Sequence, residues 1–371
     1  MDGPVAHINA VGVATPGNQV HEAFVAFAEG TLSARRDKAL FRRMAARAGI
    51  ERRWSTFVPA REGTAAEGAA PEDAIDAEGF FRRGAFPGTA ARMRRFAEQA
   101  PALAEAAARD LGTQADIAGI THLVVASCTG FCAPGVDQRL AERLGLDPDL
   151  ERISIGYMGC SAAVNALKTA RHIVRSQPHA RVLVVCVELC TLHVQEVDDL
   201  EALLAAMLFG DGAAAALVTA EPTGFSLGDF KAVTLPATQD RITWDVADTG
   251  FLMHLSGAVP QAIADALAQE RARNDAGGVL GGRRVEDYAL FAVHPGGRSV
   301  LDAVALGLEL PEEALATARS VLAENGNMSS ATILFVLREL LTQRGAAGEP
   351  GLGMAFGPGM VAETFRFARA A

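Results

Sequence analysis

The spacing of hydrophobic residues along the chain predicts both helices and buried strands. Residues 121–127 (THLVVAS) and 181–188 (RVLVVCVE) are nearly continuous apolar runs, which is typical of strands buried on both faces of a sheet. Residues 7–14 alternate weakly and end at the turn sequence TPG, which indicates another strand. Residues 20–49 and 88–111 are rich in Ala, Arg and Glu and have helical spacing. This alternation of helices and strands favours a layered α/β fold.

The segment between the two Arg-rich helical regions has a different character. Residues 59–88 are rich in Gly, Ala, Pro and Glu and show no hydrophobic period. Such a composition predicts a long surface excursion.

A weak internal repeat suggests that the chain consists of two similar halves. A buried strand ends just before Cys128, and Cys160 follows it; a second, at 287–293, ends at His294, and Asn327 follows that histidine at nearly the same spacing. Cys160 and Asn327 each follow a glycine and open a predicted helix, and each helix precedes another apolar strand. Because α/β folds gather functional residues at strand ends and helix starts, the repeat marks Cys160, His294 and Asn327 as candidates.

The composition excludes several classes of protein. The chain has 371 residues, of which 50% are hydrophobic and 21% charged, as in ordinary globular proteins. Its net charge of −10 offers no global attraction for nucleic acid. The apolar runs are too short for membrane insertion, and the first residues lack the apolar run of a signal peptide. Five cysteines, an odd number, do not suggest a disulfide framework, so we expect a cytoplasmic protein.

Cys160 and His294 are candidates for covalent and acid–base chemistry. At a helix start, the macrodipole favours a thiolate, and free backbone N–H groups can bind an oxyanion. His294 follows a buried strand and precedes Pro-Gly-Gly, where an imidazole could stabilise a thiolate or donate to an oxyanion. Both residues also have structural interpretations, because cysteine is a common small core residue and turn histidines bind backbone groups.

Asn327 has two interpretations of the same kind. Its amide is an uncharged donor, suited to a carbonyl oxygen that gains negative charge. However, an Asn after a glycine and before a helix is also a natural N-cap. The local sequence, ENGNMSSA, leaves both open.

The sequence predicts no metal or nucleotide cofactor. Two C-x3-C pairs and one nearby histidine raise the possibility of a zinc site, but the usual ligand spacings are absent. These residues are Cys128, Cys132, Cys186, Cys190 and His193. The Gly-rich segment 209–217 lacks the Lys-Ser/Thr of a P-loop and the spacing of a dinucleotide fingerprint.

A cluster of arginines is the one basic feature of this acidic chain. Its members are Arg42, Arg43, Arg47, Arg52 and Arg53, on and after an early predicted helix. Such a cluster is usually a solvated face, but it could equally grip a nucleotide phosphate.

Five segments together resemble the type III polyketide synthases, the chalcone-synthase-like group of the thiolase superfamily. They are GYMGCSAA, LFGDGAAA, AVHPGG, GNMSSAT and AFGPGMVAET, and they occur in this order at fitting distances. The resemblance covers essentially the whole chain and is weakest over residues 55–100. It implies a five-layered αβαβα fold of two duplicated halves, 1–220 with the nucleophilic cysteine and 221–371 with the catalytic histidine and asparagine. It also implies a homodimer that uses acyl-CoA and malonyl-CoA directly, without carrier protein or cofactor.

The resemblance also implies roles for individual residues. Cys160 is the acylated nucleophile, and His294 and Asn327 stabilise the enolate and the oxyanion. Phe209 matches a gatekeeping phenylalanine, and Arg43 and Arg47 match basic residues that meet the CoA phosphates. Gly357, Pro358 and Gly359 match a loop that shapes the cavity.

Departures from the plant enzymes make a plant-like chalcone product doubtful. Cys128, Cys190 and His193 stand where those enzymes have threonines, and Trp244 stands where they have a small residue. We place Met253 with these substrate-binding positions. The segments ELCTLH, ITW and NALKTARHIVRS resemble bacterial alkylresorcinol and alkylpyrone synthases, which implies fatty acyl starters and a pyrone or resorcinol-type product.

Two alternatives stay open on the sequence. A ketoacyl synthase III-type condensing enzyme shares a Cys/His/Asn triad, although the HPGG and AFGPG segments speak against it. A catalytically silent thiolase-fold binding protein is the second, and the presence of all three catalytic residue types speaks against that.

Overall fold

A single mixed sheet organises the molecule, for which the computed structural model describes residues 3–60, 75–273 and 275–370. Within these residues its nine strands have the order β11-β12-β13-β8-β1-β7-β6-β4-β5. The N-terminal part contains β1 (Ala6–Ala14), β4 (His122–Ser127), β5 (Glu151–Gly156), β6 (Val182–Leu189) and β7 (Asp211–Thr219). The C-terminal part contains β8 (Phe225–Thr234), β11 (Leu290–Val293), β12 (Pro350–Gly357) and β13 (Val361–Arg369). The parts join where residues 6–8 of β1 pair antiparallel with residues 225–227 of β8.

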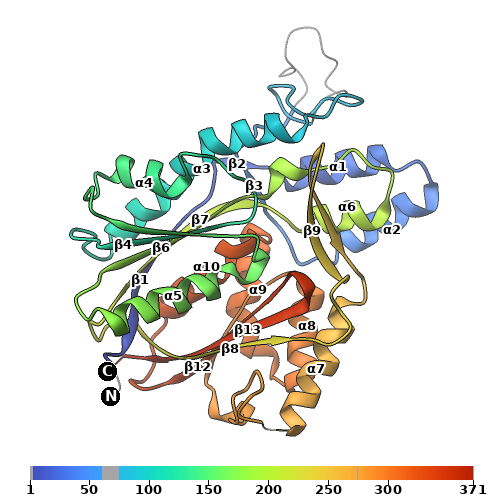
Figure 1. Ribbon diagram of the computed structural model, residues 1–371. Coiled ribbons are helices and arrows are strands. Elements are labelled where there is room, and N and C mark those ends of the chain that lie inside the picture. The colour runs from blue at the N-terminus through green and yellow to red at the C-terminus, as the bar shows by residue number, and fades with distance from the viewer. Residues whose placement is uncertain (1–2, 61–74, 274, 371) are drawn as a thin grey trace.

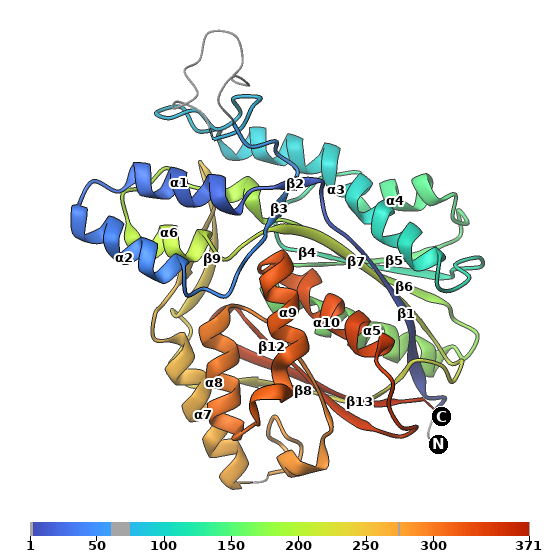
Figure 2. The same ribbon diagram turned by 180° about the vertical axis from the view of Figure 1, so that it is seen from behind.

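Helices cover and separate the two parts of the sheet (Figures 1 and 2). The central layer contains α5 (Ala162–Ser176) and α10 (Thr332–Thr342). The outer face of the N-terminal part packs against α3 (Thr89–Gly112) and α4 (Val136–Leu144), and the C-terminal part packs against α7 (Val259–Arg273), α8 (Arg298–Leu308) and α9 (Ala316–Asn325). This arrangement confirms the predicted αβαβα layering.

Sheet lies both above and below the two central helices, so the first turn of α5 and most of α10 are buried. Ala162, Ala163, Ala166 and Ala170 of α5 are completely buried, and these small side chains let both parts of the sheet approach closely. The long buried run at 332–337 does the same for α10. The residues immediately before each helix are thereby held in the interior.

A group of elements outside these layers supplies the walls of the candidate site. Helices α1 (His21–Thr31), α2 (Arg35–Ala45) and α6 (Leu200–Ala206) share a small hydrophobic core of their own. The hairpin of β9 (Ile242–Ala247) and β10 (Gly250–Leu255) contacts α6 without joining the main sheet. The short strands β2 (Asn18–Gln19) and β3 (Trp54–Ser55) pair with each other. The remaining elements are the 3-10 turns η1 (Gly159–Ser161), η2 (Cys190–His193), η3 (Val285–Asp287), η4 (Glu312–Leu315), η5 (Ser329–Ala331) and η6 (Pro358–Met360).

The predicted strands at 121–127 and 181–188 are confirmed as β4 and β6, and every residue of β6 is buried. The Arg-rich region 20–49 forms two helices rather than one, because the chain is extended at Leu32. Much of the excursion predicted at 59–88 lies outside the described residues.

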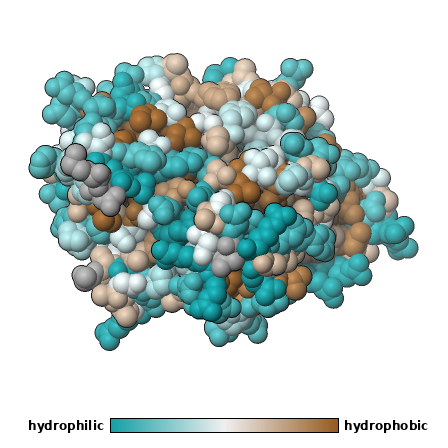
Figure 3. Space-filling view, turned by 60° about the horizontal axis from the view of Figure 1, so that its bottom comes forward, coloured by the Kyte–Doolittle hydropathy of each residue, from teal (hydrophilic) through white to brown (hydrophobic). Residues whose placement is uncertain are grey.

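Figure 3 shows one face on which hydrophobic residues lie in several patches separated by hydrophilic ones. Among the helices that the structure describes, none combines the length and apolarity needed to span a membrane.

Candidate active site

Cys160 lies in the 3-10 turn η1, and α5 begins two residues after it. The turn requires glycine at position 159, whose φ is +56° and whose added Cβ would lie 2.5 Å from Pro358 Cδ. Cys160 itself lines a cavity that we call the main cavity, because His294 and Asn327 border it as well. The local backbone therefore presents the thiol to that cavity at the N-terminal end of α5.

Asn327 reaches the same place from the other half of the chain. Its Nδ2 lies 3.9 Å from Cys160 Sγ and donates to the Gly296 carbonyl at 3.2 Å. Its Oδ1 accepts from the Ser329 backbone N–H at 2.8 Å, which is an Asx-turn rather than an N-cap of α10. The side chain therefore faces the thiol instead of closing the helix end.

His294 follows β11 and is almost completely buried at 2% exposure. Its backbone N–H donates to the Met354 carbonyl at 2.8 Å, which continues the pairing of β11 with β12. Neither ring nitrogen has a hydrogen-bond partner among the described residues, although the side chain borders the cavity that contains Cys160. Burial lowers the pKa of His294 to about 3, so the resting imidazole is neutral.

Burial also acts on the Cys160 thiol and raises its pKa to about 11. Hydrogen bonds from Ser329 and Asn327 oppose this shift, and the nearby Glu188 adds to it. The macrodipole argument, which favours a thiolate at a helix start, is therefore outweighed by desolvation. The resting site contains a thiol and a neutral imidazole in the same cavity, and a thiolate forms only if a base accepts the proton.

Cys128 belongs to a buried network behind Cys160. Its thiol lies 3.2 Å from Glu188 Oε1 and 3.1 Å from Ser329 Oγ. Glu188 also accepts hydrogen bonds from the Thr129 hydroxyl at 2.8 Å and from the Ser330 hydroxyl. Desolvation raises the pKa of this fully buried carboxyl, and the surrounding donors oppose the shift. The network fixes the floor of the cavity on which Cys128 lies.

The main cavity has a volume of about 370 Å³ and is lined mostly by apolar side chains. The predicted residues that border it are Cys128, Cys160, Cys190, His193, Phe209, Trp244, Met253, His294, Asn327 and Pro358. Gly357 and Gly359 are not among its lining residues; a Cβ at Gly357 would lie 2.5 Å from Ser161 Oγ, and Gly359 has a φ of +70°. These two glycines therefore shape the turn that presents Pro358.

An aromatic wall closes one side of the cavity. The His193 ring stacks on Phe251 with a centroid separation of 4.2 Å and meets Trp244 edge-on. His193 Nε2 lies 2.7 Å from the Thr129 carbonyl, and Nδ1 accepts from the Phe251 backbone N–H at 3.0 Å. Burial lowers the pKa of His193 to about 3. Since both ring nitrogens are bonded, His193 differs from His294 and acts as a neutral anchor for the β9–β10 hairpin.

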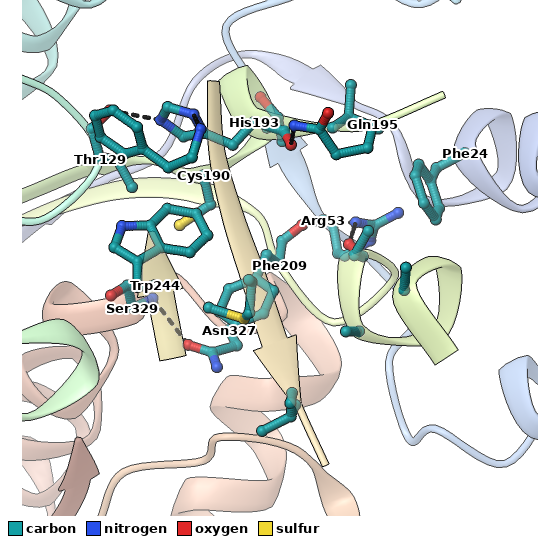
Figure 4. Close-up of a pocket in the computed structure, with 18 of the residues that line it drawn as sticks. Phe24, Arg53, Thr129, Cys190, His193, Gln195, Phe209, Trp244, Asn327 and Ser329 are labelled. Atoms are coloured by element: carbon teal, nitrogen blue, oxygen red, sulfur yellow. Dashed lines mark hydrogen bonds between the residues drawn. The ribbon is translucent and has the colours of Figure 1, made fainter. Parts of the chain in front are cut away.

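Phe209 separates two regions of the cavity. Figure 4 shows its ring between the side that carries Trp244 and Asn327 and the side that carries Arg53 and Phe24. Its backbone pairs with that of Asn327, and its carbonyl accepts from Arg53 Nη1 at 2.6 Å. The region beyond it, which we call the apolar arm, is lined by Val20, Ala23, Phe24, Val197, Ala202 and Ala206 from α1, α6 and the chain next to them.

A second cavity of about 760 Å³, which we call the basic mouth, adjoins the first. Arg43 from α2 and Arg47 from the turn directly after α2 line it, and so does Arg298 at the start of α8. Five residues border both cavities, namely Ala205, Leu255, Val259, Gly296 and Val300. Because the Gly296 carbonyl holds the Asn327 amide, the catalytic candidates lie at the junction of the two cavities.

Comparisons with known proteins place this site in a family. The alpha-pyrone synthesis polyketide synthase-like Pks18 of Mycobacterium tuberculosis is 36% identical over 290 residues, covering 74% of this chain and 72% of that protein. The profile for the N-terminal domain of chalcone and stilbene synthases matches residues 76–222, and that for the C-terminal domain matches residues 230–369. This chain belongs to the type III polyketide synthases.

Solved type III polyketide synthases have the same fold over almost the whole chain. The 1,3,6,8-tetrahydroxynaphthalene synthase of Streptomyces coelicolor is 28% identical with a TM-score of 0.84, covering 99% of both chains. PKS-I of the brown alga Ectocarpus siliculosus is also 28% identical with a TM-score of 0.84, covering 100% of this chain and 99% of that one. The protein is thus an acyltransferase of a family that condenses acyl-CoA and malonyl-CoA, and the ketoacyl synthase III-type and silent-binder alternatives are set aside.

Glu188 and Arg298 belong to this polyketide synthase site but were not predicted from the sequence. Glu188 had one available signal, a lone acidic residue in an otherwise apolar strand. Arg298 had none, since one arginine after a glycine pair is ordinary. The structure gives no support for a zinc site, because no three His, Cys, Asp or Glu side chains in the described ranges could together hold a metal ion.

Proposed function

We propose that Cys160 carries the growing acyl chain and that His294 and Asn327 stabilise charge on the reacting oxygens. The supporting observation is a single cavity that holds a thiol, an amide 3.9 Å from it and a buried imidazole with both nitrogens unpaired within the described chain. An unpaired buried polar group costs about 1–3 kcal/mol. A substrate oxygen would supply the missing partner and offset that cost.

The reaction begins with transfer of a proton from the Cys160 thiol to the His294 imidazole. The thiolate attacks the starter acyl-CoA carbonyl, and collapse of the tetrahedral intermediate expels coenzyme A, which takes up a proton. Malonyl-CoA then loses CO2, and His294 and Asn327 hold the enolate oxygen. The enolate carbon attacks the Cys160 thioester; a C–C bond forms, the C–S bond breaks, and the thiolate is regenerated. Reloading of the extended chain on Cys160 repeats the cycle until it cyclises.

The basic mouth suits the coenzyme A part of both substrates. Arg43 lies in α2 and Arg47 in the turn directly after it, and both line this mouth, so their guanidinium groups can converge on one anion. Neither forms an ion pair with a described residue, whereas the adjacent Arg42 pairs with Glu29 at 2.8 Å. We assign Arg43 and Arg47 to the coenzyme A phosphates.

The apolar arm supports a fatty acyl starter. Its walls carry aliphatic side chains and one phenylalanine from α1, α6 and the chain next to them, and the Arg53 guanidinium on the same side of Phe209 is held by the His21 ring and by the Ala206 and Phe209 carbonyls. The burial of each starter methylene there is worth about 0.8 kcal/mol. Pks18, the M. tuberculosis relative, is described as an alpha-pyrone synthesis enzyme. A pyrone or resorcinol-type product from a fatty acyl starter is the corresponding proposal for this chain.

We also propose a homodimer that works in the cytoplasm without a carrier protein. The outer edge of β5 is open among the described residues, and most of this strand is exposed. Exposed hydrophobic side chains gather next to it, at Phe131, Ile153 and Met158. An open strand edge flanked by apolar side chains is a surface that a second copy could cover.

One assay tests the function as a whole. The purified protein is incubated with malonyl-CoA and a graded series of acyl-CoA starters, and product masses are read by mass spectrometry. We expect products that correspond to the starter plus successive two-carbon units, with a preference for long starters. Absence of any extended product across the series would contradict the proposal.

A pair of variants tests the starter site. Ala23→Leu narrows the apolar arm and should move the preference toward shorter starters without loss of malonyl-CoA decarboxylation. Ala39→Leu, on the exposed side of α2, adds the same volume outside the cavity and should leave the preference unchanged. An unchanged preference in Ala23→Leu would assign the starter to another region.

A further inference from the structure

The basic mouth has cations that come from different halves of the chain. Arg43 lies in α2, Arg47 follows that helix directly, and Arg298 begins α8. Figures 1 and 2 both show α2 and α8 on the same side of the molecule, next to the β9–β10 hairpin. The side chain of Arg298 is 53% exposed, so it remains accessible to a solute in the mouth.

The guanidinium of Arg298 is only weakly engaged by its neighbours. Its Nη1 donates to the Arg47 carbonyl at 3.2 Å, and its nearest described carboxylate, Asp302, lies 3.6 Å from Nε. Asp302 is held more closely by Arg319, at 2.7 Å. Since a guanidinium offers five N–H donors in a planar fork, Arg298 keeps donors available for an anion.

We infer that Arg298 is a third phosphate-binding residue for coenzyme A thioesters and acts together with Arg43 and Arg47 at the mouth. The inference rests on the proposed use of coenzyme A at this mouth. Coenzyme A carries a pyrophosphate and a separate ribose phosphate, so it presents more anionic groups than one pair of arginines can engage in bidentate fashion. Arg298 also begins α8, where the helix macrodipole adds positive potential.

The position of Arg298 connects phosphate binding to the catalytic turn. Only Pro295, Gly296 and Gly297 separate it from His294, and the Gly296 carbonyl holds the Asn327 amide. Its bond to the Arg47 carbonyl places its guanidinium beside the turn that follows α2. A phosphate bound by Arg298 would therefore also lie near Arg47, in the mouth that adjoins the cavity of Cys160.

The test compares two thioesters of the same malonyl group. Malonyl-CoA carries the phosphates, whereas the malonyl thioester of N-acetylcysteamine has none. At low ionic strength, Arg298→Ala should raise KM for malonyl-CoA roughly fivefold, the size of one exposed charge contact, while kcat changes little. For the phosphate-free thioester, kcat/KM should equal that of the wild type. Arg298→Lys keeps the charge and should recover part of the loss.

Arg284→Ala is the matched control, because it removes one exposed arginine that lines neither cavity. It should not change KM for malonyl-CoA, whatever the ionic strength. An unchanged KM in Arg298→Ala would overturn the inference. An equal loss with both thioesters would also overturn it, because a purely structural role does not distinguish them. Failure of the proposed function is a separate outcome, in which the wild type itself extends neither thioester.

Discussion

The cavity that contains Cys160 is lined by aliphatic and aromatic side chains, whereas the basic mouth beside it carries three arginines. In the cavity, burial dominates and keeps both Cys160 and His294 neutral at rest. In the mouth, the charges face solvent and are screened by salt. The two regions meet at Gly296, which borders both. A substrate with one apolar and one polyanionic end therefore has a single orientation that places its thioester at the junction.

This contrast predicts that substitutions in the cavity and substitutions in the mouth affect different steps of the reaction. An interaction between groups in the dry cavity is strong and acts on the chemical step, because little solvent competes with it. An interaction in the mouth is weak and acts on substrate binding, because it is remote from the reacting carbon. Four substitutions, ordered by the expected size of the effect, examine the two sides.

The largest effect is expected for Cys160→Ala, which removes the proposed nucleophile from the cavity. Polyketide formation should be abolished, because burial raises the pKa of the other two thiols that line the cavity, Cys128 and Cys190, well above its usual value. Mass spectrometry after treatment with acyl-CoA should find the adduct of the wild type on the peptide that contains Cys160. Acylation confined to Cys128 or Cys190, or synthesis retained by the variant, would contradict the assignment.

The next effect concerns the pH dependence of the thiol. In His294→Ala the proton acceptor is missing, so the thiol keeps the pKa of about 11 that burial imposes. Alkylation of Cys160 by iodoacetamide should then rise about tenfold per pH unit below that pKa, or about a thousandfold from pH 7 to pH 10. In the wild type, attraction between the thiolate and a protonated His294 would offset part of the burial that separates the two pKa values, so alkylation at pH 7 should be faster and the slope shallower than in the variant. Parallel slopes in the two proteins would show that His294 is not the acceptor.

Asn327→Ala should have a smaller but still large effect. Loss of one positioned oxyanion donor typically costs about 10²–10³ in rate. Malonyl-CoA decarboxylation should fall by that factor, while acylation of Cys160 by the starter continues. Decarboxylation at the wild-type rate would show that Asn327 has only a structural role, in the Asx-turn that its Oδ1 makes with the Ser329 N–H.

The smallest effect is expected in the mouth, for the double variant Arg43→Ala/Arg47→Ala. KM for malonyl-CoA should rise about tenfold at low salt, since two exposed charge contacts are lost, with little change in kcat. Raising the ionic strength should weaken wild-type binding more than that of the variant, because screening removes what the substitutions already removed. Equal salt dependence in the wild type and the double variant would show that both arginines are solvated surface residues that do not bind coenzyme A.

The sequence predicted those features that are local. The apolar runs of β4 and β6 are long and uninterrupted, so their burial could be anticipated, and the layered fold was confirmed. Cys160, His294 and Asn327 were identified by short motifs and by the family resemblance. The raised pKa of Cys160 could not be predicted from the sequence. The helix start is visible in the sequence, whereas desolvation of the thiol depends on all the residues packed around it. Glu188 and Arg298 depend on contacts between distant segments, such as Glu188 with Ser330 and Arg298 with Arg47.

The β9–β10 hairpin has a consequence for how new product specificities arise. Trp244 and Met253 are direct cross-strand partners on it, and both line the cavity. The hairpin forms its own two-stranded ribbon, separate from the nine-stranded sheet, and His193 and Trp244 fix it to the cavity floor through single hydrogen bonds. Residues at the Trp244–Met253 pair can therefore change during evolution without altering the nine-stranded sheet. Such changes would alter the space available to the polyketide.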